Sequence, residues 1–340
     1  MMTLSRELKK GALNEINFSF APQLILWTAL ELEIFPALEG GANSLDRLAA
    51  LLRCSEKGLR RILDCLAAMG FVEKRNQTYD LTAVARSYLL PSSENYVGHL
   101  FSGSAQLMKY WLTLPEAVRT GRPTLGLFPD ADREAYDFEV IEALFQFHKH
   151  SAWELARAVL QKATPTRILD VGAGSAVWSL PFASQCPQLE VTAIDFPPVL
   201  ALARKFARRF GVEKQYRFIG GEILTVDLGE QEFDLVLLGH ICHSEGPRRS
   251  RELFSQCFRA LKNKGRLLIM DYIADEGRAS EFLPLLLALN TLLGTDEGDT
   301  FTMSEYLEWL RQAGFIGVES LCVKGHAPVV MACKEARQRL

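Results

Sequence analysis

The sequence predicts an α/β protein in two parts, a helical N-terminal region and a doubly wound, mostly parallel sheet in the C-terminal half. The first observation is that apolar residues recur every three or four places from Pro22 to about Leu90. The second is that short β-rich runs alternate with helical segments after Thr166, as in a parallel sheet covered by helices on both faces. The third is length, because 340 residues exceed what a single core usually supports.

The N-terminal region holds several short helices. Ser44 and Ser55 each precede a helical run, LDRLAALL and EKGLRRILDCLAAM, where a side-chain oxygen can accept a hydrogen bond from an unpaired amide. After Gly70 the segment FVEKRNQTYDLT predicts two short extended pieces around a polar turn. Helices followed by a hairpin in this order are typical of a winged helix.

A winged helix can bind DNA, and Lys57, Arg60 and Arg61 lie at the start of the helix that would enter the groove. The same helix also carries acidic residues, and no wider basic stripe is present to meet phosphates. We therefore favour a dimerisation or partner-binding module and expect no nucleic-acid partner.

The following segment continues as helices and ends in the long amphipathic run DFEVIEALFQFHKHSAWELARAVLQ. Phe145, His148, His150 and Trp153 fall close together on it. Packing of buried aromatic residues beside solvent-exposed histidines is the favoured interpretation of this cluster, and lining of a ligand pocket is the alternative. The segment is predicted to connect two domains.

Composition excludes several classes of protein. A formal net charge of -3 gives no general attraction to nucleic acid or to anionic membranes. The N-terminus lacks the apolar core of a signal peptide, and no apolar run reaches the roughly 18 residues of a membrane span. The cysteines are scattered without the spacing of a disulfide framework or a zinc module. We expect a cytoplasmic protein.

In the C-terminal half the predicted strands follow one another with helices between them. Gly172 and Gly174 come directly after the first strand, in RILDVGAGSAVW, with Ala176 at the third small position. Glycine there permits a tight turn, and the following helix start offers unpaired amides to a ligand. The expected strands are RILDVG, LEVTAIDF, YRFIGG, FDLVLLG, RLLIMDYI, FIGVESLCV and APVVMACK.

Acidic residues accompany the first three of these strands. Asp170 precedes the glycine turn, Asp195 ends the next strand, and Glu222 follows the third. A carboxylate in the position of Asp195 can accept both ribose hydroxyls, and Glu222 could accept from an adenine amino group. Because ligands of such sheets bind beyond the carboxyl ends of the strands, we expect a nucleoside cofactor there.

With these motifs the chain resembles class I S-adenosylmethionine-dependent methyltransferases, and within them small-molecule O-methyltransferases of the caffeic acid and acetylserotonin type. The resemblance covers nearly the whole chain. It implies a Rossmann-like seven-stranded sheet whose final hairpin reverses one strand, and a homodimer formed through the N-terminal winged-helix domain. The matching segments are DVGAGSA at 170–176, AIDFPPV at 193–199, GGEIL at 220–224, HICH at 240–243, ALKNKGRLLIMDYI at 260–273 and TFTMSEYLEWLRQAGF at 300–315.

The resemblance also implies how the chain is divided into domains. Residues 1–100 would form the dimerisation domain, residues 101–160 a helical connector that contributes to the substrate pocket, and residues 161–340 the catalytic domain. S-adenosylmethionine would be the cofactor and S-adenosylhomocysteine its product. The implied cofactor-binding residues are Asp170, Gly172, Gly174, Asp195, Phe196, Glu222, Ile223, Gly239 and His240, the last stacking against adenine.

In the family, a histidine in the loop after the fourth strand acts as general base, and His243 falls on that position. A neutral imidazole can take a hydroxyl proton near neutral pH. The family sets an acid at the end of the next strand to orient this ring, and Asp271 falls there. The predicted catalytic pair is His243 with Asp271, and capping of a turn by Asp271 is the alternative.

The chain departs from the family pattern beside this pair. Ser244 and Glu245 follow the histidine in place of aspartate and tryptophan, and Thr300, next to Asp299, occupies the place of a second acid. These departures leave open whether Glu245 or Asp299 replaces the missing acids. A metal site at the two histidines would need further ligands that the sequence does not place nearby, so we expect none.

The acceptor pocket is expected to be apolar. In the family the helix FLPLLLALNTLLG at 282–294 is one wall of this pocket, and Asn290 is one of its few polar residues. Ordinary core packing is the alternative for this helix. A wall of this composition suits a hydrophobic, aromatic acceptor. Met108, Trp111, Phe145 and His148 are further candidates for contact with the substrate.

The sequence therefore predicts an enzyme that transfers a methyl group from S-adenosylmethionine to a hydroxyl of an apolar, aromatic or polyketide-like small molecule. Carbon methylation, or a cofactor-assisted reaction without methyl transfer, is the alternative on the same fold. A ligand-sensing DNA-binding regulator is an alternative of another class. A nicotinamide oxidoreductase is disfavoured because the acidic residue inside DVGAG is atypical of that class.

Overall fold

The structure is a computed structural model that describes residues 10–125, 130–322 and 328–334. Within these ranges, no helix has the length and apolar character needed to cross a membrane. The chain divides into two compact units, Met1–Lys109 and Tyr110–Leu340. Most of the segment expected as a separate connector therefore belongs to the second unit.

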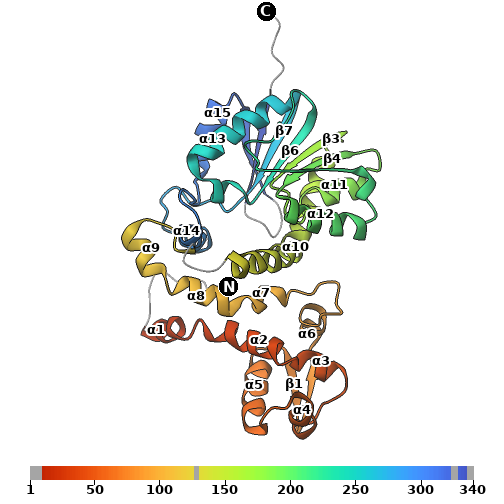
Figure 1. The fold of residues 1–340 in the computed structure, drawn as a ribbon, viewed down its shortest axis with the longest axis vertical. Coiled ribbons are helices and arrows are strands. Elements are labelled where there is room, and N and C mark those ends of the chain that lie inside the picture. The colour runs from red at the N-terminus through yellow and green to blue at the C-terminus, as the bar shows by residue number, and fades with distance from the viewer. Residues whose placement is uncertain (1–9, 126–129, 323–327, 335–340) are drawn as a thin grey trace, which may run out of the picture. The chain divides into compact units, whose positions relative to one another are not determined.

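The first unit is helical with one β-hairpin (Figure 1). Leu59, Leu63 and Leu66 lie on one face of its helix α5 because they are spaced by four and three residues, and all are buried. The predicted hairpin is confirmed as an antiparallel pair. The elements are α1 (Lys10–Asn17), α2 (Ala21–Glu31), α3 (Ile34–Glu39), α4 (Leu45–Leu52), α5 (Glu56–Ala68), β1 (Val72–Arg75), β2 (Thr78–Leu81), α6 (Ala83–Tyr88) and α7 (His99–Ser102), and α8 (Ser104–Trp111) contains the boundary between the units.

The two predicted helix caps have different outcomes. Ser55 begins α5, and its hydroxyl oxygen accepts a hydrogen bond from the amide of Gly58 at 3.2 Å, as expected. Ser44 occupies the N-cap position of α4 but makes no side-chain capping bond, so that part of the prediction was wrong.

Arg60 of α5 and the hairpin residues Lys74 and Arg75 are paired with acids inside the unit. Asp64 accepts from Arg60 at 2.7 Å and from Lys74 at 2.6 Å, and Arg75 pairs with Glu73. This pairing neutralises charge that contacts with phosphate would need, which favours a module that contacts protein.

The second unit is a seven-stranded sheet in the order β5-β4-β3-β6-β7-β9-β8, which confirms the predicted fold class. Strands β5, β4, β3, β6 and β7 pair in parallel with their neighbours. Strand β9 is antiparallel to both β7 and β8, so the final hairpin reverses one strand as expected. The elements are α9 (Leu114–Thr120), α10 (Asp130–Leu160), β3 (Arg167–Val171), α11 (Leu180–Gln185), β4 (Glu190–Asp195), α12 (Pro197–Arg209), the 3-10 helix η2 (Glu213–Gln215), β5 (Tyr216–Gly220), β6 (Phe233–Gly239), α13 (Cys242–Ala260), β7 (Leu261–Met270), α14 (Phe282–Gly294), α15 (Met303–Gln312), β8 (Ile316–Leu321) and β9 (Val329–Cys333).

Helices cover both faces of this sheet. Side chains alternate along β3, so Ile168 joins one apolar core while Leu169 joins the other. Helices α10, α11 and α12 contribute to the first core, and α13 and α15 to the second (Figure 1). Burial on both faces explains the nearly continuous apolar runs of the central strands and leaves the strand ends free to hold a ligand.

Candidate active site

The carboxyl ends of the parallel strands meet at one edge of the sheet. The chain runs outward from β3 through β4 to β5 and then crosses to β6 on the other side of β3. Open α/β sheets bind ligands at such a reversal of strand order. The expected site residues that end or closely follow these strands are Asp170, Gly172, Asp195, Glu222, Gly239, His240 and Asp271.

The glycine turn after β3 has the backbone conformation that its sequence predicts. Gly172 and Gly174 have φ of 66° and 56°, a region that favours glycine. The amide of Gly172 donates to the carbonyl of Ile194, which ties the turn to β4. A Cβ on Gly172 would lie 3.1 Å from the side chain of Ile241, a tight contact that this side chain would have to shift to relieve.

Asp195 at the end of β4 joins two predicted cofactor segments. Its carboxylate accepts from the amide of Gly174 at 2.8 Å and from the amide of Phe196 at 2.7 Å. Burial raises the pKa of Asp195 while these two hydrogen bonds oppose the shift. The ring of Phe196 is 56% exposed, so it can offer a face to a flat ligand.

Asp170 lies beneath the glycine turn and is buried. Its carboxylate accepts from the Ser179 hydroxyl at 2.5 Å, and that hydroxyl lies 3.0 Å from the Tyr216 hydroxyl. Burial raises the pKa of Asp170 to about 7, with the Ser179 hydrogen bond opposing and the charge of Asp195 adding to the shift. Asp170 thus supports the segment before α11, and its direct contact with a cofactor stays a prediction. Ile223, another predicted contact, has its side chain in the core.

His243 and Asp271 lie together as predicted. His243 Nδ1 is 2.7 Å from Asp271 Oδ1, and the His243 amide donates to Asp271 Oδ2 at 3.1 Å. A carboxylate beside Nδ1 favours the tautomer with its proton on Nδ1, which leaves Nε2 free to accept a proton. The pair therefore has the geometry of an oriented general base.

Asp271 is itself held by a set of donors. The Tyr272 amide donates to its carboxylate at 2.8 Å and the Tyr306 hydroxyl at 3.4 Å, and the residue is 1% exposed. Burial lowers the pKa of His243, but the charge and hydrogen bond of Asp271 outweigh it, so the pKa is raised. Tyr306 was not predicted, because nothing in its local sequence shows that α15 reaches this carboxylate.

His240 lies in an aromatic cluster at the same strand end. Its φ is 56°, and its ring centroid is 4.2 Å from that of His148, 5.9 Å from that of Trp178 and 5.1 Å from that of Tyr272. His148 is thus buried beside His240, and its contact with a ligand stays a prediction. Stacking of His240 on adenine stays a prediction.

Gly239 has a packing reason that sequence reasoning missed. A Cβ there would lie 2.2 Å from the Trp178 ring, so the strand end needs glycine for close approach of this tryptophan. Trp178 is buried and directly follows the glycine turn. Its position in GAGSAVW was the available signal, since a bulky ring there must find space against a neighbouring strand.

His240, His243 and Asp271 also place one possible metal-ligand atom each within 4.8 Å of one another. Asp271 is a third candidate ligand that sequence reasoning did not consider. However, its carboxylate already accepts from the His243 ring, from two amides and from the Tyr306 hydroxyl. An ion would have to displace the ring hydrogen bond, so this donor set fits an oriented base better, and a site without metal stays our prediction.

The residues that depart from the family pattern have partners of their own. Glu245 accepts from Arg249 Nε at 2.5 Å, and Arg249 also pairs with Glu222. Asp299 pairs with Arg278 at 3.3 Å. Within the described ranges, neither Glu245 nor Asp299 makes a hydrogen bond with the His243 ring. Of these three acids, only Asp271 is hydrogen-bonded to the ring in the part of the chain that the structure describes.

Helix α13 is broken close to His243. Gly246 has φ 73° and ψ 178°, a conformation essentially restricted to glycine, and Pro247 follows it. A Cβ on Gly246 would lie 2.4 Å from the carbonyl oxygen of Glu297. The break lets residues 242–245 form a separate turn that carries the histidine.

Replacement of Gly246 by Ala is expected to lower the free energy of unfolding by about 1–3 kcal/mol, since it adds backbone strain to a clash with backbone. Chemical denaturation measures the loss. Gly211→Ala is the matched control, because Gly211 has a φ of 71° but nothing lies within 4 Å of its added Cβ. Equal losses in the two variants would contradict the role of the clash.

Phe145 follows the favoured interpretation of its cluster, core packing, and is withdrawn as a candidate for contact with the substrate. It is 1% exposed, and its ring stacks on Phe206 with centroids 3.9 Å apart. The side chain therefore packs between α10 and α12 in the core and has no free face for an acceptor.

The other predicted substrate residues are dispersed. Asn290 is exposed on α14, and Met108 and Trp111 are half-buried on α8. Met108 belongs to the first unit and Trp111 to the second. Their contact with an acceptor stays a prediction.

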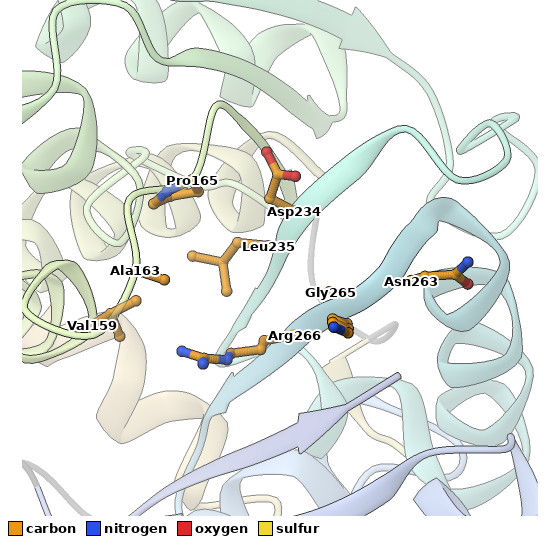
Figure 2. A pocket seen from close by; sticks show the side chains of 9 residues that line it. Val159, Ala163, Pro165, Asp234, Leu235, Asn263, Gly265 and Arg266 are labelled. Atoms are coloured by element: carbon orange, nitrogen blue, oxygen red, sulfur yellow. The ribbon is translucent and has the colours of Figure 1, made fainter. Parts of the chain in front are cut away.

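A cavity of about 340 Å³ lies at the opposite edge of the sheet, away from these residues. It is bounded by the segment before β3 and by the starts of β6 and β7, with Pro165, Asp234 and Arg266 among its lining residues (Figure 2). Because ligands of this fold bind at the carboxyl ends of the strands, the cavity is separate from the candidate active site.

A seven-stranded sheet in which only β9 is antiparallel, with a glycine turn after β3 that is hydrogen-bonded to the acid at the end of β4, is the arrangement of class I S-adenosylmethionine-dependent methyltransferases. The chain belongs to the O-methyltransferase family. The model of the O-methyltransferase domain matches residues 111–316, and that of the O-methyltransferase dimerisation domain matches residues 15–91. The protein is thus an S-adenosylmethionine-dependent O-methyltransferase with a dimerisation domain.

Similar proteins agree with this assignment. The chain is 31% identical to the 3-hydroxy-5-methyl-1-naphthoate 3-O-methyltransferase of Streptomyces sahachiroi over 85% of its own length and 84% of the relative's. It is 29% identical to the tetracenomycin polyketide synthesis 8-O-methyl transferase TcmO of Streptomyces glaucescens, over 93% and 94% of the two chains. A structure from Nostoc punctiforme assigned as an O-methyltransferase matches 96% of this chain and 100% of its own, with a TM-score of 0.84 and 26% identity.

Proposed function

We propose that the protein methylates a hydroxyl of an apolar, aromatic or polyketide-like small molecule, with His243 as general base. The observation that carries this proposal is the 2.7 Å contact between His243 Nδ1 and Asp271 at the carboxyl edge of the sheet. The residues at this edge also fit the cofactor, because strand-end acids can accept from its hydroxyl and amino groups and the exposed ring of Phe196 can face its base. In this proposal Glu222 accepts from the adenine amino group.

S-adenosylmethionine, when bound, supplies an electrophilic methyl group and leaves as S-adenosylhomocysteine. Nε2 of His243 would take the acceptor's hydroxyl proton, and the oxygen could then accept the methyl group that the bound cofactor would supply, with the electron pair of the methyl–sulfur bond remaining on sulfur. Asp271 keeps the imidazole in the productive tautomer and stabilises its protonated form. The proton then leaves His243 for solvent.

The acceptor class rests on two lines of support. The relatives named above methylate a naphthoate and act in tetracenomycin polyketide synthesis. In this chain α14 is almost wholly apolar, and Phe282, Leu283 and Leu289 on it are exposed. An apolar helix of this kind suits one wall of a pocket for an aromatic ring system.

The N-terminal unit is proposed to form a homodimer. Its family match is to a dimerisation domain, and α1 and the turn after it expose Leu13, Ile16, Phe18 and Phe20. Exposed apolar residues grouped in this way are typical of an interaction surface.

A panel of hydroxylated naphthoates and polyketide aromatics, assayed by release of S-adenosylhomocysteine and by mass spectrometry of the product, tests the proposed reaction. The methyl group is expected on oxygen. Methylation on carbon would favour the first alternative, and conversion of the acceptor without release of S-adenosylhomocysteine would favour a reaction without methyl transfer.

Replacement of Asp195 by Asn is expected to raise the dissociation constant of S-adenosylhomocysteine at least about tenfold, because a hydrogen bond to a charged group contributes about 1.5–3 kcal/mol. Isothermal calorimetry measures it without an acceptor. Asp227→Asn removes an exposed carboxylate as a control and should leave binding unchanged. An affinity within about twofold of wild type for Asp195→Asn would contradict the proposed contact.

A further inference from the structure

Arg249 on α13 connects two acids that belong to different parts of the proposed reaction. Its Nε donates to Glu245 Oε2 at 2.5 Å, and its terminal nitrogen pairs with Glu222 Oε1. Glu222 follows β5 at the proposed adenine site, whereas Glu245 lies in the turn that carries His243. The Arg249 guanidinium therefore contacts one acid at the proposed adenine site and another in the turn that carries the proposed base.

The break in α13 gives this contact its importance. Residues 242–245 form a short turn that Gly246 and Pro247 separate from the rest of the helix. Because the helical hydrogen-bond ladder is interrupted there, the turn needs other contacts to hold its position. The bond from Arg249 to Glu245 crosses the break and fastens the turn to the following helical segment.

The same guanidinium fixes the Glu222 carboxylate. The other oxygen of this carboxylate, Oε2, accepts from the Leu224 amide at 3.1 Å, so both oxygens have a partner. The side chains of Arg249, Glu222 and Glu245 are 33%, 33% and 15% exposed, so solvent only partly screens their charges. Without the guanidinium, the carboxylates of Glu222 and Glu245 would lose the positive charge that they share.

We propose that Arg249 is a positioning residue that couples the cofactor acid Glu222 to the catalytic turn of His243. This inference rests on the proposed function, and it gives Glu245 a role: Glu245 anchors the turn to Arg249, whereas Asp271 orients the imidazole. An arginine suits this task because its planar fork donates in two directions at once, whereas a lysine ammonium is a single point charge.

The test begins with Arg249→Met, which removes the charge and keeps an unbranched apolar chain. It is expected to raise the dissociation constant of S-adenosylhomocysteine about tenfold and to lower kcat about tenfold, within the range of coupling between contacting residues. KM for the acceptor should change less than about twofold. Arg248→Met is the matched control, because Arg248 is 68% exposed and pairs with Glu297 instead, and both constants should stay at wild-type values.

Double-mutant cycles separate positioning from a merely structural effect. When Glu222→Gln is added to Arg249→Met, the dissociation constant of S-adenosylhomocysteine should rise by less than about a further twofold. When Glu245→Gln is added to Arg249→Met, kcat should fall by less than about a further twofold. Additive effects in both cycles, or wild-type constants for Arg249→Met, would overturn the proposal. Arg249→Lys is the second variant if Arg249→Met folds poorly. A wild-type dissociation constant and a wild-type kcat for Arg249→Lys would also contradict the proposal that one guanidinium must hold both acids.

The binding cycle requires no acceptor and no turnover. Its failure therefore shows that Arg249 does not position Glu222, while leaving the role of His243 intact. An active His243 variant would instead overturn the general base and leave the binding cycle readable.

Discussion

A variant in which His243 is replaced by Gln is expected to turn over at least about 100-fold more slowly than wild type, since a positioned general base contributes about 10²- to 10⁴-fold. Its affinity for S-adenosylhomocysteine should remain within about twofold of the wild-type value, because the proposed adenine and ribose contacts lie on other strands. Steady-state kinetics and calorimetry on the same preparation measure the two effects.

His150→Gln is the matched control for this experiment. His150 lies on α10 with its side chain exposed, so the substitution makes the same chemical change outside the site. It should leave kcat unchanged. Wild-type turnover by the His243 variant would rule out its role as base, and an equal loss in the His150 variant would point to a general effect of removing a histidine.

Replacement of Asp271 by Asn is expected to reduce turnover about 100-fold or more, because an amide can hold the imidazole in the wrong tautomer. The pH dependence should change as well. His243 acts as base in its neutral form, so the rate rises with pH through its pKa, which the Asp271 charge helps to raise above the usual value. Removing that charge should move the rising limb of the rate profile to lower pH.

The double variant with both His243→Gln and Asp271→Asn separates a shared role from two independent ones. If Asp271 acts only through His243, the double variant should be about as slow as His243→Gln alone, since residues that act as a unit are strongly non-additive. Multiplied losses would indicate that Asp271 has a second function. A rate profile of Asp271→Asn that does not move on the pH axis would contradict the charge effect.

Much of the fold could be predicted because its causes are local. The switch from a helical to a strand period near Thr166 marks the start of the sheet, and β9 is the reversed strand that the closing hairpin implied. Ser55 caps its helix because an N-cap depends only on residues three places apart. Ser44 also lies at the N-cap of its helix but makes no capping hydrogen bond. The local pattern therefore predicts where a helix begins better than it predicts the hydrogen bond of the capping side chain.

Candidate site residues could be predicted from the sequence where they lie at the end of a strand. Asp195 and Asp271 end or directly follow strands, so the carboxyl edge of the sheet brings them toward the glycine turn and His243. For Phe145 the sequence left core packing and substrate contact as alternatives, because a helical period shows that residues share a face but not which partner covers that face. Its partner is Phe206 on α12, which the sequence does not single out.

By itself, then, the sequence determined the order of strands and helices, the glycine turn and the pairing of His243 with Asp271, because each depends on short-range pattern or on family position. Only the tertiary structure decided which side chains hold that pair and that the unusual Glu245 pairs with Arg249. Tyr306 reaches Asp271 across 35 positions of sequence, and Arg249 reaches Glu222 across 27. Such contacts come from the packing of α13 and α15 on the sheet, and no local pattern in the chain encodes them.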